Sequence, residues 1–336
     1  MKTTNNGIES ICSFGKEAAG SWPANLRMEK NTNRKLLLLG LLVLCWTASI
    51  IPASAQGLRV PWVQVGTGGL DFDVPCAGVT GVCLPQAIAA GPGADRSSIG
   101  PGPWMLSQES NGAGDYEIAL WYYYPGPSPE WVDYIGGFNA ATQIASSPQG
   151  TLWVVNHAGQ IFYWNGDGYT EAPGNGCAVA IGVGPATASD PNGTPWVIGC
   201  NGSASQNGGI YYLNGSSWVQ VPGAATRIAV SPEGIPWVVT AAGNIFYFNG
   251  SVFINVPGCA TNIAVGPTTA PLAGPNGDVW VIGCSGVAGS GNAIYQLEYG
   301  TTWLQYPGWA SQISVSPGLG IPWVINEQGV IYVQNQ

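Results

Sequence analysis

The chain has 336 residues, only 8% of them charged, a formal net charge of −9, and many Gly (50), Pro (26) and Trp (15) residues. A hydrophobic share of 46% excludes a disordered chain. Scarce Lys and Glu beside abundant Gly, Pro and aromatic residues disfavour a helical bundle, and an acidic balance argues against a nucleic-acid partner, which requires clustered Lys and Arg.

The N-terminal part of the chain carries an export signal. Basic residues precede the apolar run 36–45, and an Ala-x-Ala cleavage site ends at Ala55. We therefore expect an N-terminal extension with a secretory signal peptide at 1–55 and a secreted or periplasmic domain at 56–336. No later stretch approaches 18 apolar residues, so we expect no transmembrane segment in the mature chain.

A Trp followed by an apolar residue recurs along the mature chain at intervals of 49, 43, 41, 43 and 43 residues. The six copies are Trp104, Trp153, Trp196, Trp237, Trp280 and Trp323. Around each Trp the same four apolar segments return in the same order, which indicates four strands per unit. Four-stranded units of this length are typical of propellers. The sequence predicts an all-β fold, a six-bladed β-propeller of four-stranded blades.

The two ends of the mature chain complement each other. The last unit stops at 331–333 and lacks a fourth strand, while the segment 62–65 matches the fourth-strand segment 218–221. We therefore expect the N-terminal strand to complete the last blade and close the ring, which removes open sheet edges.

The units alternate in type. After the first strand three units carry Gly-Pro and a long connection, and three carry Ser-Pro and a short one. Six cysteines follow this alternation; an even number in an exported protein favours disulfides over metal ligands, although sequence alone permits 15 connectivities. Identical placement in two long units implies two bridges, and in the first long unit Gln108 replaces the second Cys. The expected disulfides are Cys76–Cys83, Cys177–Cys200 and Cys259–Cys284.

Residues with catalytic potential are few. His157 is the only histidine and lies in a predicted turn, without a nucleophile elbow. Asp71 and Asp73 resemble a calcium-binding pair but lack further ligands, and the other carboxylates are scattered. We expect no catalytic residue, no metal and no cofactor. A hydrolase that uses two scattered carboxylates is the least favoured alternative.

Aromatic and amide side chains are the better candidates for a site, because rings stack on sugar faces and amides bond to hydroxyls. The aromatic residues at the repeat positions are expected to pack between blades. Residues that break the pattern, or follow the Trp strand, are the predicted ligand-binding residues: Trp121, Trp164, Trp309, Asn156, Thr240 and Asn326. Turn formation is the alternative explanation for the last three.

The segments 153–164 and 323–332 resemble the tectonin repeat, with its pattern Trp-x-Val-Asn-x-x-Gly-x-Ile-aromatic. The resemblance covers about residues 58–336 and implies a six-bladed propeller of the kind found in lectins that bind bacterial lipopolysaccharide or methylated glycans. We therefore expect a secreted, non-enzymatic propeller that recognises glycans or lipopolysaccharide. The alternative is an extracellular propeller that binds other proteins or is structural. A lectin predicts equivalent polar and aromatic pockets in alternate blades, whereas an enzyme predicts one pocket with converging acids.

Overall fold

The computed structural model describes residues 62–65, 84–92, 103–110, 116–124, 130–133, 141–203, 205–287 and 291–334. The described strands belong to one compact unit, Arg59–Gln336. The expected signal peptide at 1–55 and the expected Cys76–Cys83 bridge lie outside the described residues. Among the described residues no helix could span a membrane.

Within the described residues, the strands form six four-stranded sheets, and neighbouring strands of each sheet run antiparallel. In chain order, the first three sheets consist of β2 (Leu84–Ala89), β3 (Trp104–Ser110), β4 (Tyr116–Tyr124) and β5 (Glu130–Asp133); β6 (Ala141–Ser146), β7 (Leu152–Asn156), β8 (Ile161–Trp164) and β9 (Tyr169–Glu171); and β10 (Ala178–Val183), β11 (Pro195–Gly199), β12 (Gly208–Asn214) and β13 (Ser217–Ala225).

The other three sheets follow the same plan. They consist of β14 (Arg227–Val230), β15 (Pro236–Val239), β16 (Ile245–Phe248) and β17 (Phe253–Val256); β18 (Ala260–Gly266), β19 (Asp278–Val287), β20 (Gly291–Glu298) and β21 (Thr302–Ala310); and β1 (Trp62–Gln64), β24 (Ile331–Gln334), β23 (Pro322–Ile325) and β22 (Gln312–Val315), in that spatial order. Each sheet except the last is therefore a meander of four consecutive strands.

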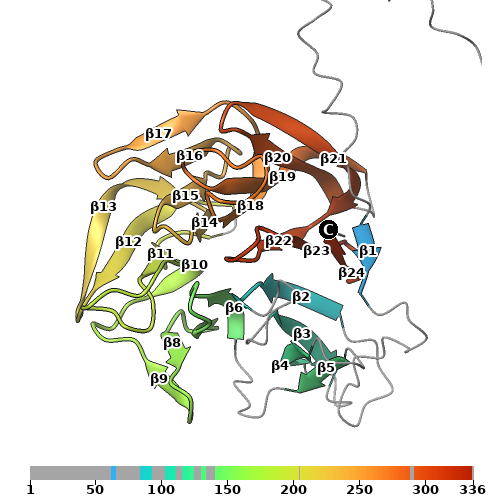
Figure 1. Ribbon diagram of the computed structural model, residues 1–336. Helices are drawn as coiled ribbons and strands as arrows, with labels where there is room; N and C mark the ends of the chain where they lie inside the picture. The colour runs from blue at the N-terminus through green and yellow to red at the C-terminus, as the bar shows by residue number, and fades with distance from the viewer. Residues whose placement is uncertain are drawn as a thin grey trace, which may run out of the picture. The chain divides into compact units, whose positions relative to one another are not determined.

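The innermost strands of the sheets surround a common centre (Figure 1). Strand β2 contacts β6 and β22, and the contacts continue in order through β10, β14 and β18 to β22. Strands of all these sheets line one central cavity. The chain thus forms an all-β propeller with four-stranded blades, which confirms this part of the sequence prediction.

Strand β1 comes from the opposite end of the chain to the rest of its sheet. It pairs antiparallel with β24, and Val63 lies opposite Val333. The N–H of Val65 donates to the carbonyl of Ile331 at 3.0 Å. Val65 is buried in one hydrophobic cluster with residues of β2, β23 and β24.

The repeated Trp residues form the core, as expected from their spacing. All six are buried, between 0 and 8% exposed. Trp153, for example, belongs to a cluster with Val183 and Val197 of the next sheet, and its ring centroid lies 5.0 Å from that of Tyr163 on its own sheet. The periodic aromatic residues thus fill the space between neighbouring sheets, which explains why they recur at a fixed interval.

The alternation of Gly-Pro and Ser-Pro also has a structural cause. The serines are fully buried, and their hydroxyls accept backbone N–H groups in the short connections, for example from Thr151 to Ser147 at 3.0 Å. In the long units, a Cβ on Gly266 would lie 2.6 Å from Val315 of the following sheet. Serine therefore stabilises a tight turn, whereas glycine allows the neighbouring sheet to approach.

Candidate functional site

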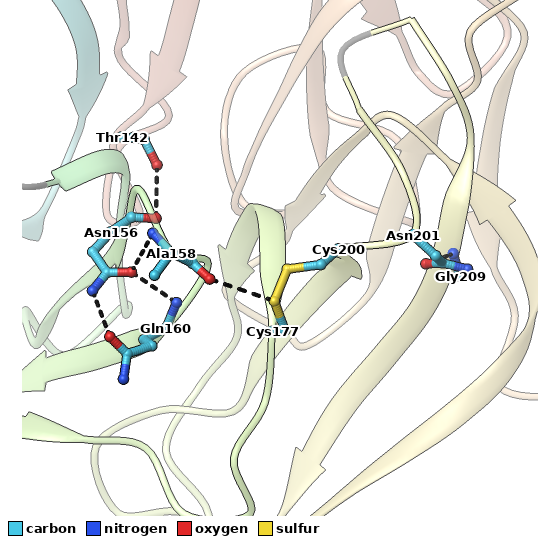
Figure 2. The surroundings of a disulfide bond; sticks show 8 residues. All are labelled: Thr142, Asn156, Ala158, Gln160, Cys177, Cys200, Asn201 and Gly209. Atoms are coloured by element: carbon cyan, nitrogen blue, oxygen red, sulfur yellow. Dashed lines mark hydrogen bonds between the residues drawn. A yellow bond between two sulfur atoms is a disulfide. The ribbon is translucent and has the colours of Figure 1, made fainter.

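The polar residues that follow the Trp strands shape turns. In the turn after β7, Oδ1 of Asn156 accepts the N–H groups of Ala158 and Gln160 at 3.0 and 2.8 Å (Figure 2). Asn326 accepts two N–H groups in the same way, and Thr240 accepts one through its hydroxyl. These contacts agree with the turn-forming alternative, and they leave the predicted ligand-binding role of the three residues untested.

The three aromatic candidates lie in different surroundings. Trp164 is half-buried and its ring meets that of Tyr169 edge-on at a centroid distance of 5.2 Å. Trp309 is 39% exposed, one of the largest exposed hydrophobic side chains in the described part. Trp121 lies on β4 opposite Met105, and its side chain lies outside the described residues. The structure therefore does not bring these three residues into one site.

Two of the predicted residues do come together. Trp309 and Asn326 line a cavity of about 310 Å³ between the β18–β21 sheet and the sheet that contains β1, with Trp62 and Tyr332 on its other walls. We call this cavity the Trp309 pocket. Ala224 holds the place of Trp309 in the β10–β13 sheet, in the sequence Pro-Gly-Ala-Ala instead of Pro-Gly-Trp-Ala. The Trp309 pocket therefore has no counterpart of the same composition there.

A second kind of pocket lies at the β10–β13 sheet. It has a volume of about 380 Å³ and is lined by Tyr211, Trp218 and the Cys177–Cys200 disulfide, with Asn201 at its edge. We call it the Trp218 pocket. A Cβ on Gly199 would lie 2.9 Å from the Tyr211 ring, so the ring lies directly against this glycine.

The β18–β21 sheet contains an equivalent pocket of about 390 Å³, the Trp303 pocket. Tyr295, Trp303 and the Cys259–Cys284 disulfide line it. A Cβ on Gly283 would lie 2.8 Å from the Tyr295 ring, which repeats the approach of Tyr211 to its glycine. The same aromatic pair and disulfide thus occur in two alternate sheets.

The tryptophans of the fourth strands are held by hydrogen bonds to the preceding sheet. In each case the indole N–H donates to the carbonyl of a proline, which follows the fourth strand of the preceding sheet for Trp218 and Trp303 and lies within that strand for Trp62. The bonds run from Trp218 to Pro173 (3.1 Å), from Trp303 to Pro257 (2.6 Å) and from Trp62 to Pro307 (2.7 Å). Because the N–H is bound to protein, each ring is held in one orientation.

The disulfides form the wall between each pocket and the preceding sheet. The structure contains Cys177–Cys200 and Cys259–Cys284, both as predicted. Figure 2 shows the first bridge beside the Asn156 turn, where Sγ of Cys177 lies 3.7 Å from the carbonyl oxygen of Ala158. Gly159 of this turn has φ +80°, and a Cβ there would lie 2.5 Å from Sγ of Cys200. The turn that Asn156 stabilises therefore supports the pocket wall.

The Trp218 and Trp303 pockets share one kind of lining. Their described linings contain aromatic rings, glycines, a disulfide and, at the edge, an amide or hydroxyl, but no Asp or Glu. The described residues contain no cluster of three or more His, Cys, Asp or Glu that could hold a metal. An exposed ring face beside amide groups suits a ligand that has one apolar face and several hydroxyls.

Sequence reasoning missed the main residues of these pockets. It assigned Tyr211 and Tyr295 to packing between blades, and both do pack against the clusters between the sheets, but it did not predict that they also line pockets and did not single out Trp218 or Trp303. The structure shows that all four are half-buried instead of fully enclosed. A usable signal was present: glycine stands after the Trp-Val-Ile strand of these two units, at the position where short units carry Asn or Thr, and it leaves room for the tyrosine ring.

A buried acid lies elsewhere in the β18–β21 sheet. Both oxygens of Asp278 accept hydrogen bonds, from Gln296 Nε2 at 2.7 Å and Trp280 Nε1 at 2.8 Å, and Tyr306 donates to the same Gln296. Burial raises the pKa of Asp278 to about 6, although the two hydrogen bonds oppose the shift. This acid lies in the core and lines none of the three pockets.

Comparison with known protein families gives a match for part of the chain. The model of the tectonin domain matches residues 196–336, which supports the resemblance found in the repeats. The comparison with curated proteins gives no match.

Solved structures with a similar fold have low sequence identity to this chain. They include a GH74 enzyme of Niastella koreensis (14% identity, 75% of this chain and 43% of that chain, TM-score 0.44) and virginiamycin B lyase of Staphylococcus aureus (14%, 75% and 95%, 0.45). A mutant of AofleA from Arthrobotrys oligospora is also similar (12%, 74% and 83%, 0.45). This chain spans less than half of the GH74 enzyme.

Proposed function

We propose that this chain, whose residues 196–336 match the tectonin domain, is an exported, non-enzymatic propeller that binds glycans, including the sugar part of lipopolysaccharide. The observation that carries the proposal is the repetition of one aromatic pocket, with Tyr211 and Trp218 in one sheet and Tyr295 and Trp303 in another. Repeated pockets suit a ligand that itself repeats, because several weak contacts then combine into strong binding.

The pocket walls support a sugar as the ligand. Each offers an indole and a phenol ring with a fixed orientation, which is the surface that stacks on the apolar face of a pyranose. Hydroxyl groups of the same sugar can reach Asn201 in one pocket and Ser285 in the other. The absence of carboxylates from the described linings fits binding better than acid–base hydrolysis, which requires a pair of them.

We further propose a ring of six blades whose last blade is completed by β1. Two observations support this arrangement: β1 pairs with β24, and Trp62 makes the same indole-to-proline bond as Trp218 and Trp303. A chain that starts at residue 66 should therefore unfold at a clearly lower temperature than the chain 56–336. Equal melting temperatures would contradict closure by this strand.

Export is proposed from the Ala55 cleavage site and from the two disulfides, which persist in oxidising compartments. N-terminal sequencing of the protein recovered outside the cytoplasm should find residue 56 first. A mature protein that begins before residue 36 would contradict cleavage at this site.

A glycan array probed with the mature chain tests the proposed function. We expect binding to a subset of glycans, equal with and without EDTA, and strong loss in the double variant Trp218→Ala/Trp303→Ala. The matched control Trp218→Phe/Trp303→Phe keeps a ring in each pocket and should retain most of the binding. No binding to any glycan at high display density would overturn the proposal.

The Trp309 pocket favours a second candidate function, the binding of another protein. It combines an exposed tryptophan with an apolar wall and has no copy of the same composition at the β10–β13 sheet. Aromatic residues in single pockets often carry the energy of protein interfaces. A Trp309→Ala variant that keeps full glycan binding but loses a co-purifying protein would support this candidate.

A further inference from the structure

The central cavity of the propeller differs in its lining from the proposed glycan pockets. It has a volume of about 150 Å³, and strands β2, β6, β10, β14, β18 and β22 line it. The lining combines Ile, Val, Ala and Gly residues with polar side chains, and Arg227 is the charged residue among the described lining residues.

Four of the polar side chains occupy one repeat position, while Gln86, Ser146 and Ser314 belong to the lining at other positions. Each innermost strand contains an isoleucine, and the residue before it is part of the cavity lining. Two strands carry alanine there and four carry a larger polar side chain: Gln143, Arg227, Asn262 and Gln312. Because the innermost strands surround one centre (Figure 1), these four repeat positions lie around the same cavity, and we call them the polar level.

Arg227 is the charged member of this level. Its side chain is half-buried, and its one hydrogen bond in the described structure runs from Nη1 to the carbonyl of Thr226 at 3.1 Å. No Asp or Glu is among the described residues that line the cavity. Burial removes water from the guanidinium and thereby lowers its pKa. A guanidinium has five N–H donors, so most of them remain available.

The neighbouring amides add further donors. Asn262 gives its Nδ2 to Oε1 of Gln312 at 2.9 Å and to the carbonyl of Ser311 at 3.3 Å. This contact uses the acceptor of the Gln312 amide and leaves its Nε2 group as a donor. The level therefore combines one cation with amide N–H groups and lacks a negative charge of its own in the described part.

We propose that the central cavity binds a small oxyanion, a phosphate or carboxylate group, held by Arg227 with the help of Gln312. The planar guanidinium matches two oxygens of such a group, and its partial burial strengthens the pairing. The volume admits a group of this size. The proposal does not depend on glycan binding in the aromatic pockets, since it concerns another part of the molecule.

Thermal unfolding of the mature chain in inorganic phosphate tests the proposal. Compared with sodium chloride at equal ionic strength, millimolar phosphate should raise the melting temperature by several degrees, because a ligand of the folded state stabilises it. The variant Arg227→Gln should not show this phosphate-dependent rise in melting temperature. In sodium chloride it should melt at the temperature of the wild type or above. It removes a poorly solvated charge while keeping a polar side chain.

Phosphate also stabilises proteins without binding, so the difference between variants is the decisive quantity. An equal phosphate increment in the wild type and in Arg227→Gln would overturn the proposal. If Arg227→Gln fails to fold, Arg227→Lys replaces it, with an expected loss of affinity of about tenfold because a single ammonium cannot bind two oxygens in parallel. Calorimetric titration of the wild type with phosphate that shows no saturable heat would equally overturn it.

A parallel titration with glucuronate and with glucose identifies the source of the oxyanion. Saturable binding of glucuronate that requires Arg227 indicates the acidic group of a sugar, whereas binding of phosphate alone indicates a free anion. Either result supports an oxyanion site. Glucose is the neutral control, and Arg227-dependent binding of glucose would contradict recognition of charge.

Discussion

The Trp218 and Trp303 pockets share their aromatic residues and a disulfide but differ in their polar residues. Both combine a tyrosine against a glycine, a tryptophan bonded to a proline carbonyl, and a disulfide. The polar lining residues differ, however. The Trp218 pocket contains Asn175 and Asn201, whereas the Trp303 pocket has Ser285 at the position of Asn201. The Trp303 pocket has no counterpart of Asn175, because a single glycine separates Pro257 from Cys259. The aromatic part is thus constant and the polar part varies.

This difference separates two tasks. Ring stacking recognises the flat apolar face that most pyranoses share, whereas amide and hydroxyl groups at the edge distinguish one pattern of hydroxyls from another. We infer that the two pockets share a class of ligand and differ in preference within it.

Removal of a disulfide should lower the free energy of unfolding by the largest amount, and by the same amount for each of the two bridges. The bridges close chain separations of 23 and 25 residues, so the chain-entropy model predicts about 3 kcal/mol of lost stability for each. Denaturant unfolding of Cys177→Ala/Cys200→Ala and Cys259→Ala/Cys284→Ala measures this. A large cost in one copy and none in the other would contradict their structural equivalence.

The cores of the two sheets differ at one position, where Asp278 in the second corresponds to Thr194 in the first. Because the folded state raises the pKa of Asp278 from 3.8 to about 6, the favourable contribution of its protonated form is fully present below about pH 4. That contribution is lost as pH rises to about 6, by up to about 3 kcal/mol.

The variant Asp278→Asn should therefore flatten the pH dependence of stability between about pH 4 and pH 6. Chemical unfolding of both proteins across this range measures the difference in slope, which is unaffected by a constant cost of the altered hydrogen bond to Trp280 or Gln296. Parallel curves for wild type and variant would show that this acid titrates normally.

Each pocket tryptophan should contribute separately to ligand affinity. Trp218→Ala and Trp303→Ala should each weaken binding at their own pocket about tenfold, equivalent to about 1.4 kcal/mol, because the stacking face is removed. Titration calorimetry with a glycan from the array measures this. The matched variants Trp218→Phe and Trp303→Phe lose the bond to the proline carbonyl but keep a ring. If the Phe variants bound as weakly as the Ala variants, the ring face would not be the binding element.

Exchange of the polar residue that differs between the two pockets should have the smallest effect on ligand binding. Ser285→Asn is expected to move the ligand preference of the Trp303 pocket toward that of the Trp218 pocket by about two- to tenfold, the value of one hydrogen bond. Comparison of array profiles for wild type and variant measures this. The reverse change, Asn201→Ser, also removes the contact from Gly209 to Asn201 Oδ1 and is the less clean test. Unchanged profiles would assign specificity to other groups.

The repeat made much of this fold predictable from sequence. Because Trp153 and its equivalents must fill the same space between sheets, their spacing reveals the strand plan, and identical placement of Cys177 and Cys259 reveals their partners. The pockets were harder to find, since a tyrosine such as Tyr211 has the same sequence context whether it is enclosed or open on one side. That distinction depends on how closely the ring approaches Gly199 and on what the next sheet covers.

The most direct test of the account is the number and affinity of the glycan molecules bound per mature chain, measured by titration calorimetry with a monovalent ligand chosen from the array. We predict that Trp218→Ala and Trp303→Ala each convert one high-affinity site into a site about tenfold weaker, and that the double variant does so at both pockets while remaining folded. A folded double variant that binds as many molecules as the wild type, with the same affinity, would contradict the repeated aromatic pockets as the binding sites.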